Sequence, residues 1–502
     1  MAALPSNAEV AVIGAGTMGA GIARVAAAAG HPVIIYDTRE GAAARAIDTI
    51  RTDLDRQVER GKLLRSDAES LVERLHPALH LDVMGRARLA IEAIVEDRDA
   101  KIALFRDLER VVQPDAILAT NTSSISVNAI GGALKHPERC VGMHFFNPAH
   151  LMPLVEVVAA LTASEKAIET VTATAIAWGK RAIRVNSTPG FVVNRVARPY
   201  YAEALRTRSE FYAGLSDIDA ALTESGGFRM GPFRLMDMIG NDVNYAVTRS
   251  VFEAFSYDRR FAPSLLQQEL VDAGRLGRKS GRGYYSYDPQ ATDPHVDESP
   301  AGPAPSRVVV HGDLGVAAPL VALARAKGIA VEECAGDDPR IEVNGVALKL
   351  TDGALATEHG RVRPTVLFDL ALDYEACTRV VIASGLEGDR RGDVAAGFFQ
   401  ALGKRVTPLS DIPGMIVMRT VTAIANEAST MLTERISDET IDLAMTLGVS
   451  YPLGPLAWGE RIGWPRVLTV LENMCRLLGP ERYRPAYVLR LRALDAAGRA
   501  AS

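Results

Sequence analysis

Residues 9–37 have the sequence EVAVIGAGTMGAGIARVAAAAGHPVIIYD, and this stretch decides the fold. An apolar run at 10–13 leads into a glycine-rich turn, an alanine-rich stretch with helical periodicity and a second apolar run at 33–36. Short apolar runs bounded by turn residues are typical of buried strands. The segment is therefore predicted to form a β-α-β unit.

Further apolar runs follow this unit, separated by segments with helical periodicity, at 89–95, 116–119, 140–144 and 154–158. Strands that alternate with helices predict an open, mainly parallel sheet covered by helices on both faces. We therefore expect an α/β fold whose first domain, residues 1–187, is a dinucleotide-binding domain of the Rossmann type.

The character of the sequence changes after Pro189-Gly190, where long helical stretches replace the strand-like runs. Residues 288–306 are rich in Pro, Asp, Ala and Ser without apolar periodicity, which predicts a linker. Apolar runs and helical segments alternate again from Arg307 onward. Since 502 residues exceed what one core supports, we expect a helical domain at 188–287, the linker, a degenerate Rossmann-like domain at 307–405 and a second helical domain at 406–502.

An internal repeat supports this division. The motif PGFVVNR at 189–195 returns as PGMIVMR at 413–419, and MGP at 230–232 returns as LGP at 453–455. The helical domain is therefore present twice. The apolar run at 308–312 resembles the first strand but lacks its three-glycine turn, so only the first α/β domain is expected to bind a dinucleotide.

Charge and cysteine usage narrow the function classes. A net charge of -5 argues against a nucleic-acid partner. The cysteines lack the spacing of a zinc site and the density of a disulfide scaffold, so we expect no metal and reduced thiols at Cys140, Cys334, Cys377 and Cys475. No apolar run approaches the roughly 18 residues needed to cross a bilayer, and no secretion signal is recognisable. The expectation is a cytoplasmic protein with a small-molecule ligand and no membrane partner.

The turn after the first strand has the three-glycine spacing of a dinucleotide-binding loop, in Gly14, Ala15, Gly16, Thr17, Met18 and Gly19. The glycines allow a tight turn, close approach of a pyrophosphate and close helix packing, and the helix N-terminus favours phosphate. Asp37 closes the second strand, where a carboxylate accepts ribose hydroxyls and repels a 2′-phosphate, so NAD is favoured over NADP. Arg39 could hold a 2′-phosphate, although a solvated surface charge is the commoner role.

Polar residues follow two of the later apolar runs, in NTSS at 121–124 and HFFNP at 144–148, and Glu156 lies on the next predicted strand. The carboxyl ends of strands in a parallel sheet converge on the ligand crevice. Histidine, with an unperturbed pKa of about 6.5, suits proton transfer, and a carboxylate on its other ring nitrogen fixes the tautomer. Taken alone, His144 is more often a hydrogen-bonded structural histidine, and Glu156 a surface carboxylate.

These motifs resemble those of the 3-hydroxyacyl-CoA dehydrogenases over residues 1–287, in the family's order. The matching stretches are GAGTMG at 14–19, NTSS at 121–124, HFFNP at 144–148, LVEV at 154–157, TPGF at 188–191 with Asn194-Arg195, and GRKSG at 277–281. One departure is Pro153, where the family commonly has lysine. This residue puts a substrate contact or the shape of the acyl pocket in doubt.

The resemblance implies NAD-dependent oxidation of an (S)-3-hydroxyacyl-CoA to the 3-ketoacyl-CoA. It implies that Ser123 hydrogen-bonds the reacting oxygen, His144 is the general acid/base, Glu156 orients His144 and Asn194 completes the site. It also implies cofactor contacts from Glu96, Lys101, Asn147 and Lys279.

The length and the duplicated helical domain are similar to two-copy bacterial members of the family found in aromatic-acid and phenylacetate breakdown. These members act on short or dicarboxylic substrates such as 3-hydroxyadipyl-CoA or 3-hydroxybutyryl-CoA, and the residues do not choose between the two. Arg56 and Arg60, in a basic stretch at 51–65 on a predicted helix, are candidates to meet the CoA phosphates. A solvated helix face explains these arginines equally well.

The second copy is not expected to be catalytic, because Met418 stands where Asn194 stands and the His144 segment has no counterpart. Single-copy relatives pair through their helical domains. The resemblance therefore implies that residues 406–502 pack on the first helical domain as a tethered, internal pseudo-dimer partner. Assembly of whole chains into a homo-oligomer stays open.

Two other functions stay open at this point. The family includes a crystallin that keeps the fold in a structural role, so a non-enzymatic NAD-binding protein is one alternative. The complete set of Ser123, His144, Glu156 and Asn194 argues against it. The other alternative is a dehydrogenase of the β-hydroxyacid type, which shares the glycine turn but relies on a lysine base.

Overall fold

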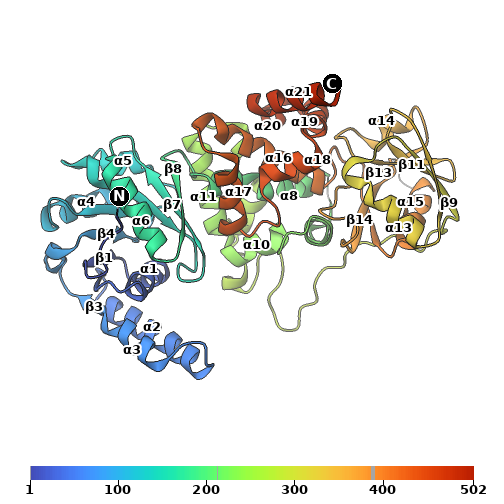
Figure 1. Cartoon of the computed structure of the whole chain (residues 1–502). Coiled ribbons are helices and arrows are strands. Elements are labelled where there is room, and N and C mark those ends of the chain that lie inside the picture. Colours follow the sequence, from blue (N-terminus) through green and yellow to red (C-terminus); the bar gives the residue numbers. More distant parts are fainter. Residues whose placement is uncertain (1, 212, 386–389, 502) are drawn as a thin grey trace. The chain divides into compact units, whose positions relative to one another are not determined.

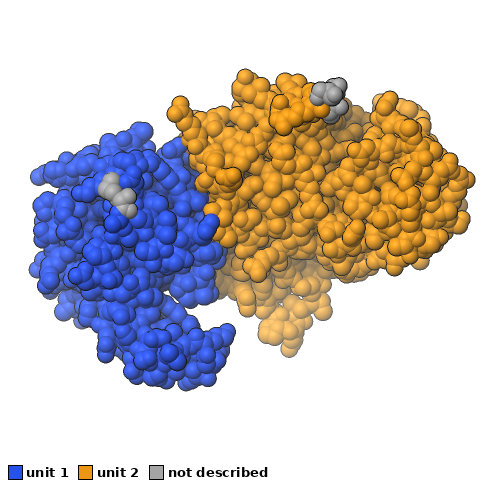
Figure 2. Space-filling model, in the orientation of Figure 1, with its two compact units in different colours: residues 1–194 blue, residues 195–502 orange. Residues whose placement is uncertain are grey.

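The computed structural model describes residues 2–211, 213–385 and 390–501. The chain divides into two units, Met1–Asn194 and Arg195–Ser502, which Figure 2 colours separately. Among the described residues, no helix combines the length and the apolar character that a membrane span requires.

The first unit contains an eight-stranded sheet (Figure 1). Its strands are β1 (Val10–Ile13), β2 (Val33–Tyr36), β3 (Leu75–Ala78), β4 (Leu89–Glu92), β5 (Ile117–Thr120), β6 (Cys140–Phe145), β7 (Leu154–Ala159) and β8 (Arg181–Asn186). Their order is β3-β2-β1-β4-β5-β6-β7-β8, and neighbouring strands are parallel except β6 and β7. This arrangement confirms the predicted Rossmann-type sheet.

Helices cover this sheet and connect its strands: α1 (Thr17–Ala28), α2 (Ala42–Glu59), α3 (Arg65–Glu73), α4 (Arg98–Val111), α5 (Val127–Gly131) and α6 (Glu165–Ala177), with 3-10 turns at Leu81–Arg86 and Pro137–Arg139. Ile22 and Ala26 of α1 are fully buried against the strands, which explains the small apolar residues of this helix. The side chains of Asp97 and Ser164 cap α4 and α6. The short helix α7 (Val193–Val196) begins at the last two residues of this unit and continues into the first two of the second.

The second unit combines two sets of helices with a smaller sheet (Figure 1). The first set is α8 (Arg198–Phe211), α9 (Leu215–Ala220), α10 (Pro232–Ile239), α11 (Asn241–Ala254) and α12 (Leu265–Asp272), with short turns at Ala221–Ser225, Arg259–Phe261 and Arg278–Ser280. The second set is α16 (Val417–Met431), α17 (Asp438–Gly448), α18 (Pro455–Ile462), α19 (Trp464–Leu478), α20 (Pro480–Tyr483) and α21 (Tyr487–Ala501), with a turn at Leu432–Glu434.

The sheet of the second unit has seven strands, ordered β10-β9-β11-β12-β13-β14-β15. They are β9 (Arg307–His311), β10 (Ala330–Cys334), β11 (Arg340–Val343), β12 (Val346–Leu350), β13 (Thr365–Phe368), β14 (Arg379–Ala383) and β15 (Arg405–Pro408), accompanied by a turn at Gly315–Ala317 and helices α13 (Pro319–Ala326), α14 (Ala356–Gly360) and α15 (Arg391–Ala401). The last three strands repeat the end of the first sheet, with an antiparallel pair β13–β14 and a parallel pair β14–β15.

Residues 288–306 form neither helix nor strand, and they are attached to the second sheet. The Ser299 amide donates to the Val406 carbonyl at 2.7 Å, and Glu298 pairs with Arg379 at 2.9 Å. The segment is therefore fixed along β14 and β15, which a compositional argument for a linker does not reveal.

The internal repeat is also a structural repeat. Gly190 and Gly414 open the two PG turns with φ of 74° and 73°, and the residues after them, Phe191 and Met415, also have positive φ. In the first set of helices Asp219 accepts the Phe233 and Arg234 amides at the start of α10. Asp442 does the same for Leu456 and Ala457 at the start of α18. Corresponding carboxylates thus cap corresponding helices.

Helices α8 and α16 pack against each other, and two ion pairs join α16 reciprocally to α7 and α8. Arg195 Nε lies 2.7 Å from Glu427 Oε1, and Arg419 Nε lies 2.7 Å from Glu203 Oε2. All four side chains are buried. Arg195 and Glu203 hold the same positions in the first copy as Arg419 and Glu427 in the second. Reciprocal pairing of equivalent residues is the pattern of an isologous, two-fold interface.

Candidate active site

The glycine turn after β1 has the shape that a dinucleotide needs. Gly14 has φ of 103°, and a Cβ there would lie 2.4 Å from the Ala93 carbonyl oxygen. A Cβ on Gly19 would lie 1.7 Å from the Gly14 oxygen, whereas a Cβ on Gly16 would meet no atom within 4 Å. Helix α1 has no side-chain cap, so its first amides are available to phosphate. The predicted glycine roles therefore fit a pyrophosphate beside Gly16.

Asp37 follows β2, and its carboxylate meets the same turn. Its Oδ2 accepts the Ala15 amide at 2.8 Å, and Arg39 Nε lies 3.1 Å from Oδ1. Burial raises the pKa of Asp37, but the hydrogen bonds from Arg39 and from the amides of Ala15 and Arg39 outweigh it and lower the pKa to about 2. Asp37 is therefore anionic, and the exposed Arg39 is paired with it.

An ionic cluster, made of the buried pair Lys101–Glu92 and the exposed Glu96, supports the loop that carries Ser123. Lys101 Nζ lies 2.5 Å from Glu92 Oε1 and 3.2 Å from Glu96 Oε2. Glu96 Oε1 accepts the Thr122 hydroxyl at 2.7 Å and the Ser123 amide at 2.9 Å. Burial raises the pKa of Glu96, but Lys101 and the loop donors outweigh it, so the pKa falls below its usual value.

Glu92 belongs to this cluster although the sequence analysis does not identify it. Its side chain is fully buried at the end of β4 and also accepts the Thr120 hydroxyl at 2.7 Å and the Ile94 amide at 2.7 Å. The last bond helps to end the strand at Glu92, short of the predicted 89–95. A carboxylate inside an apolar run, with Lys101 on the next helix, was the signal available in the sequence.

His144 and Glu156 lie directly opposite each other on β6 and β7. His144 Nδ1 is 2.7 Å from Glu156 Oε2, and both side chains are buried. The rings of Phe146 and Phe191 lie 4.6 and 5.7 Å from the imidazole ring. The pair is therefore held between aromatic rings, with one ring nitrogen bound to a carboxylate.

The second oxygen of Glu156 joins this pair to the PG turn. Oε1 accepts the Val192 amide at 3.0 Å and the Val193 amide at 3.1 Å. The next residue, Asn194, donates from Nδ2 to the Ser123 carbonyl at 3.3 Å. A continuous set of hydrogen bonds in the first unit thus connects the segments of Ser123, Asn194, Glu156 and His144.

The remaining predicted residues lie outside this set of hydrogen bonds. Asn147 is exposed just after β6. Arg56 and Arg60 are exposed at the C-terminal end of α2, and no carboxylate among the described residues pairs with either. Lys279 belongs to the second unit, where its Nζ lies 2.6 Å from Asp242 Oδ1. Pro153 immediately precedes β7, and its carbonyl accepts the Arg181 amide at 2.7 Å.

The second copy also has a carboxylate that binds the start of a helix, but no histidine contacts this carboxylate among the described residues. Asp369 follows β13, and its Oδ2 accepts the Ile416 and Val417 amides at 2.9 and 2.7 Å. Its Oδ1 accepts the amide of Met418, the counterpart of Asn194. Burial raises the pKa of Asp369 to about 6, although the amide donors lower it. Asp369 is a structural carboxylate that sequence comparison of the copies did not find.

Family models match residues 9–188, 190–287 and 348–501. The model described as "3-hydroxyacyl-CoA dehydrogenase, NAD binding domain" matches residues 9–188, and the one described as "3-hydroxyacyl-CoA dehydrogenase, C-terminal domain" matches 190–287 and 414–501. A third, "3-hydroxybutyryl-CoA dehydrogenase reduced Rossmann-fold domain", matches residues 348–413. The C-terminal-domain model thus matches twice, at the two copies of the internal repeat.

Among similar proteins, the 3-hydroxyadipyl-CoA dehydrogenase of Escherichia coli K12 is 44% identical over 97% of this chain and 98% of its own length. A 3-hydroxybutyryl-CoA dehydrogenase of Mycobacterium tuberculosis H37Rv is 38% identical over 56% of this chain and 98% of its own. The crystal structure of a 3-hydroxybutyryl-CoA dehydrogenase from E. coli K12 superposes with a TM-score of 0.89 at 44% identity, covering 98% of this chain and 99% of that one.

Proposed function

Because the chain belongs to the 3-hydroxyacyl-CoA dehydrogenase family and is thus an NAD-dependent oxidoreductase, we propose that it oxidises short-chain or dicarboxylic (S)-3-hydroxyacyl-CoA thioesters with His144 as general acid/base. The observation that carries the proposal is the buried bond between His144 Nδ1 and Glu156 Oε2. This bond leaves the opposite ring nitrogen, Nε2, to exchange a proton with the substrate.

The proton steps follow from this geometry. NAD, when bound, accepts the hydride from carbon 3 of the substrate. His144 Nε2 takes the hydroxyl proton as the carbonyl forms, and the Glu156 carboxylate stabilises the resulting imidazolium. Ser123 donates a hydrogen bond to the reacting oxygen, and Asn194 completes the site. In the reverse direction the same imidazolium returns the proton to the oxygen.

The proposed cofactor residues fall into two groups. The turn at 14–19 holds the pyrophosphate through its amides, and Asp37 accepts the ribose hydroxyls. Glu96, Lys101 and Asn147 of the first unit and Lys279 of the second are proposed as further contacts. The open space at Gly16 and the uncapped start of α1 support the proposed pyrophosphate site at the turn.

The substrate proposal rests on two full-length similarities. One relative is a 3-hydroxyadipyl-CoA dehydrogenase and the matching crystal structure is of a 3-hydroxybutyryl-CoA dehydrogenase, so we propose one of these acyl groups. The exposed, unpaired Arg56 and Arg60 are the proposed partners of the CoA phosphates. A cytoplasmic location is part of the same proposal.

We propose that the second helical copy, within 406–502, serves as a tethered dimer partner for the first copy, within 188–287. The reciprocal pairs Arg195–Glu427 and Arg419–Glu203 support this role. The degenerate domain at 307–405 then acts as the connection between the copies. Since a tether gives a high effective concentration, the contact forms without association of separate chains.

The test combines a substrate panel with one variant. Wild type should oxidise 3-hydroxyadipyl-CoA or 3-hydroxybutyryl-CoA with NAD faster than longer-chain thioesters, measured as NADH absorbance. His144→Ala should lower kcat by about 10²- to 10⁴-fold, the usual span for general acid-base catalysis. The control is His136→Ala, which changes an exposed histidine and should leave kcat unchanged. A near-normal rate for His144→Ala would refute the proton-transfer role.

A further inference from the structure

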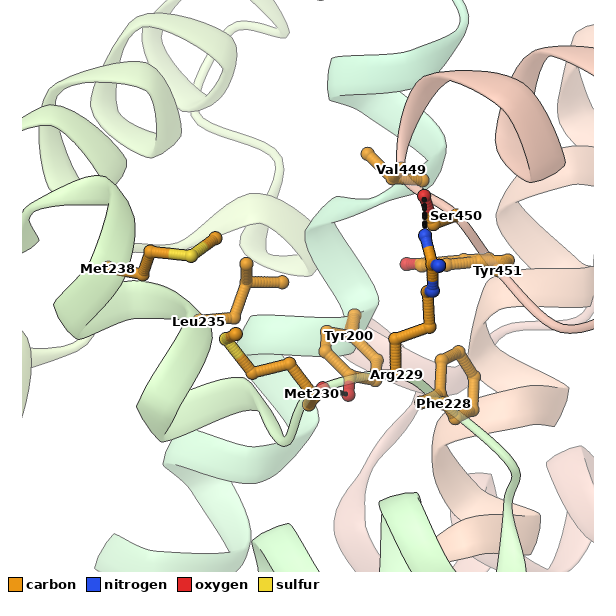
Figure 3. Close-up of a pocket in the computed structure, with 9 residues that line it drawn as sticks. All are labelled: Tyr200, Phe228, Arg229, Met230, Leu235, Met238, Val449, Ser450 and Tyr451. Carbon is orange, nitrogen blue, oxygen red and sulfur yellow. Dashed lines mark hydrogen bonds between the residues drawn. The ribbon is translucent and has the colours of Figure 1, made fainter. Parts of the chain in front are cut away.

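A cavity of about 330 Å³ lies within the second unit, between α8, α10 and the turn that joins α17 to α18 (Figure 3). Its walls come from both helical copies: Tyr200, Phe228 and Leu235 from the first, and Val449 and Tyr451 from the second. The volume is within the range of small-molecule sites, roughly 300–1,000 Å³. None of these residues belongs to the proposed dehydrogenase site.

Three aromatic rings form one wall of the cavity. The ring centroids of Tyr200 and Phe228 are 4.8 Å apart, those of Phe228 and Tyr451 5.1 Å, and those of Tyr200 and Tyr451 5.7 Å. Leu235 and two methionines, Met230 and Met238, face them across the cavity (Figure 3). This lining suits a flexible or flat apolar group, because methionine adapts to the shape of its neighbour.

One polar group of this wall has no partner. The Tyr451 hydroxyl is buried, and no described residue accepts its hydrogen bond, whereas the Tyr200 hydroxyl donates to the Met230 carbonyl at 2.6 Å. Burial raises the pKa of Tyr451 well above its usual value, so the hydroxyl stays protonated and is a donor. A buried donor without an acceptor costs free energy, which an acceptor on a ligand would recover.

A cation stands on the same side of the cavity. Arg229 is exposed, and it lines the same cavity as Tyr451 (Figure 3). Its Nη1 donates a long hydrogen bond of 3.4 Å to Ser450 Oγ, and within the described ranges no carboxylate forms an ion pair with it. A cavity lined by both a guanidinium without a carboxylate partner and a phenol donor favours an anionic acceptor such as a carboxylate.

The internal repeat provides a comparison for this site. Counting from the MGP and LGP motifs, Trp458 stands where Leu235 stands, and Pro452 where Arg229 stands. Trp458 is 1% exposed, so its indole fills interior space. The two copies thus differ at the side chains that keep the cavity open and give it positive charge. The first copy has the smaller side chain, Leu235, and the cation, Arg229.

We propose that this cavity binds a small carboxylate with an apolar tail. The carboxylate accepts hydrogen bonds from Tyr451 Oη and the Arg229 guanidinium, and the tail lies against Tyr200, Phe228 and Leu235. The site uses residues of the second unit alone and does not depend on the proposed proton transfer at His144.

The test is isothermal titration of the full chain with sodium hexanoate and with hexan-1-ol, which lacks the carboxylate. Wild type should bind hexanoate and should bind hexanol at least about ten-fold more weakly. Tyr451→Phe and Arg229→Gln should each weaken hexanoate binding about 10- to 100-fold, the range for a hydrogen bond to a charged group. Leu235→Trp, which copies the second repeat, should abolish it.

The control variant is Tyr257→Phe, which changes an exposed tyrosine of the same unit and should bind hexanoate like wild type. If Leu235→Trp fails to fold, the conservative pair Tyr451→Phe and Arg229→Gln still decides the outcome. Absence of hexanoate binding by wild type at millimolar concentration would overturn the proposal. So would hexanoate binding of wild-type strength in Tyr451→Phe and Arg229→Gln, because the ligand would then lie elsewhere.

Discussion

Glu156 uses both oxygens of its carboxylate, one on His144 and the other on the amides of Val192 and Val193. A buried carboxylate must have its acceptor sites filled, since an unpaired buried charge is strongly unfavourable. The same group therefore orients the imidazole and fixes the turn that ends in Asn194. The position of Asn194 and the tautomer of His144 therefore both depend on the side chain of Glu156.

Asp37 determines the expected preference for NADH over NADPH. Because the pKa of Asp37 is about 2, the carboxylate is charged at any working pH and repels a 2′-phosphate. At roughly 4 Å this repulsion amounts to one to several kcal/mol. Asp37→Ser should therefore raise the ratio of kcat/KM for NADPH to that for NADH at least about ten-fold, with Asp48→Ser as the control. An unchanged ratio would mean that the ribose contact is misplaced.

At the scale of elements, the two sheets differ in the strand position of the carboxylate that accepts the amides at the start of the following helix. The Asp369 amide donates a hydrogen bond to the Val381 carbonyl, so Asp369 lies opposite Val381. Val381 in turn pairs with Thr407, which lies ten residues before the start of α16. Glu156 pairs with Ile183, likewise ten residues before α7. Asp369 thus occupies the place of His144, and Val381 that of Glu156. The second copy has the corresponding contact with the helix start, but Asp369 and Val381 stand where His144 and Glu156 stand in the first copy.

Asp369→Asn should destabilise the second unit in a pH-dependent way. The pKa of Asp369 is about 6 in the folded chain and about 3.9 when unfolded. Its stabilisation is therefore complete below pH 4 and falls as the pH rises through 6. The gap in Tm between wild type and Asp369→Asn should be largest near pH 4 and smaller at pH 7. The exposed Asp337→Asn is the control. A gap that widens with pH would show that the amides hold the carboxylate charged.

The predicted strands and the observed ones differ for reasons visible in particular segments. Strand β3 has two exposed central residues and contains Pro77, and β8 has exposed arginines, so neither is a continuous apolar run. The hairpin of β11 and β12 turns at Asn344-Gly345, both with positive φ. Asn-Gly between alternating apolar residues is a strong hairpin signal, and it was present in the sequence.

At the scale of the whole molecule, buried ion pairs hold the repeated helices of the second unit together. The buried pairs Arg195–Glu427 and Arg419–Glu203 each join one copy to the other. Additional donors reach the same carboxylates, since Arg260 binds Glu427 and Tyr483 binds Glu203. The contact between the copies is therefore an ionic network as well as an apolar surface, and its parts should be coupled.

Arg419→Met should lower the free energy of unfolding of the helical part by at most about 3–5 kcal/mol, because it removes one of the two arginines that pair with the buried Glu203, the other being Arg206. The double variant Arg419→Met with Glu203→Met should recover much of the loss. The comparison is Arg490→Met, which breaks an exposed pair with Glu472 and should cost at most about 1 kcal/mol. Urea unfolding followed by circular dichroism measures all three. Equal losses for the single and double variants would contradict the coupling.

The sequence by itself determined the local and repeated features of this protein. The glycine turn, Asp37, the motifs around Ser123 and His144 and the duplicated helical domain depend on residues close in the chain, where spacing and periodicity are visible. Only the tertiary structure decided which distant groups come together: Glu92 meets Lys101, Asp369 meets the start of α16, and Arg229 and Tyr451 line one cavity. The physical reason is that burial, pairing and the order of strands in a sheet are set by the packing of whole elements, which no local pattern encodes.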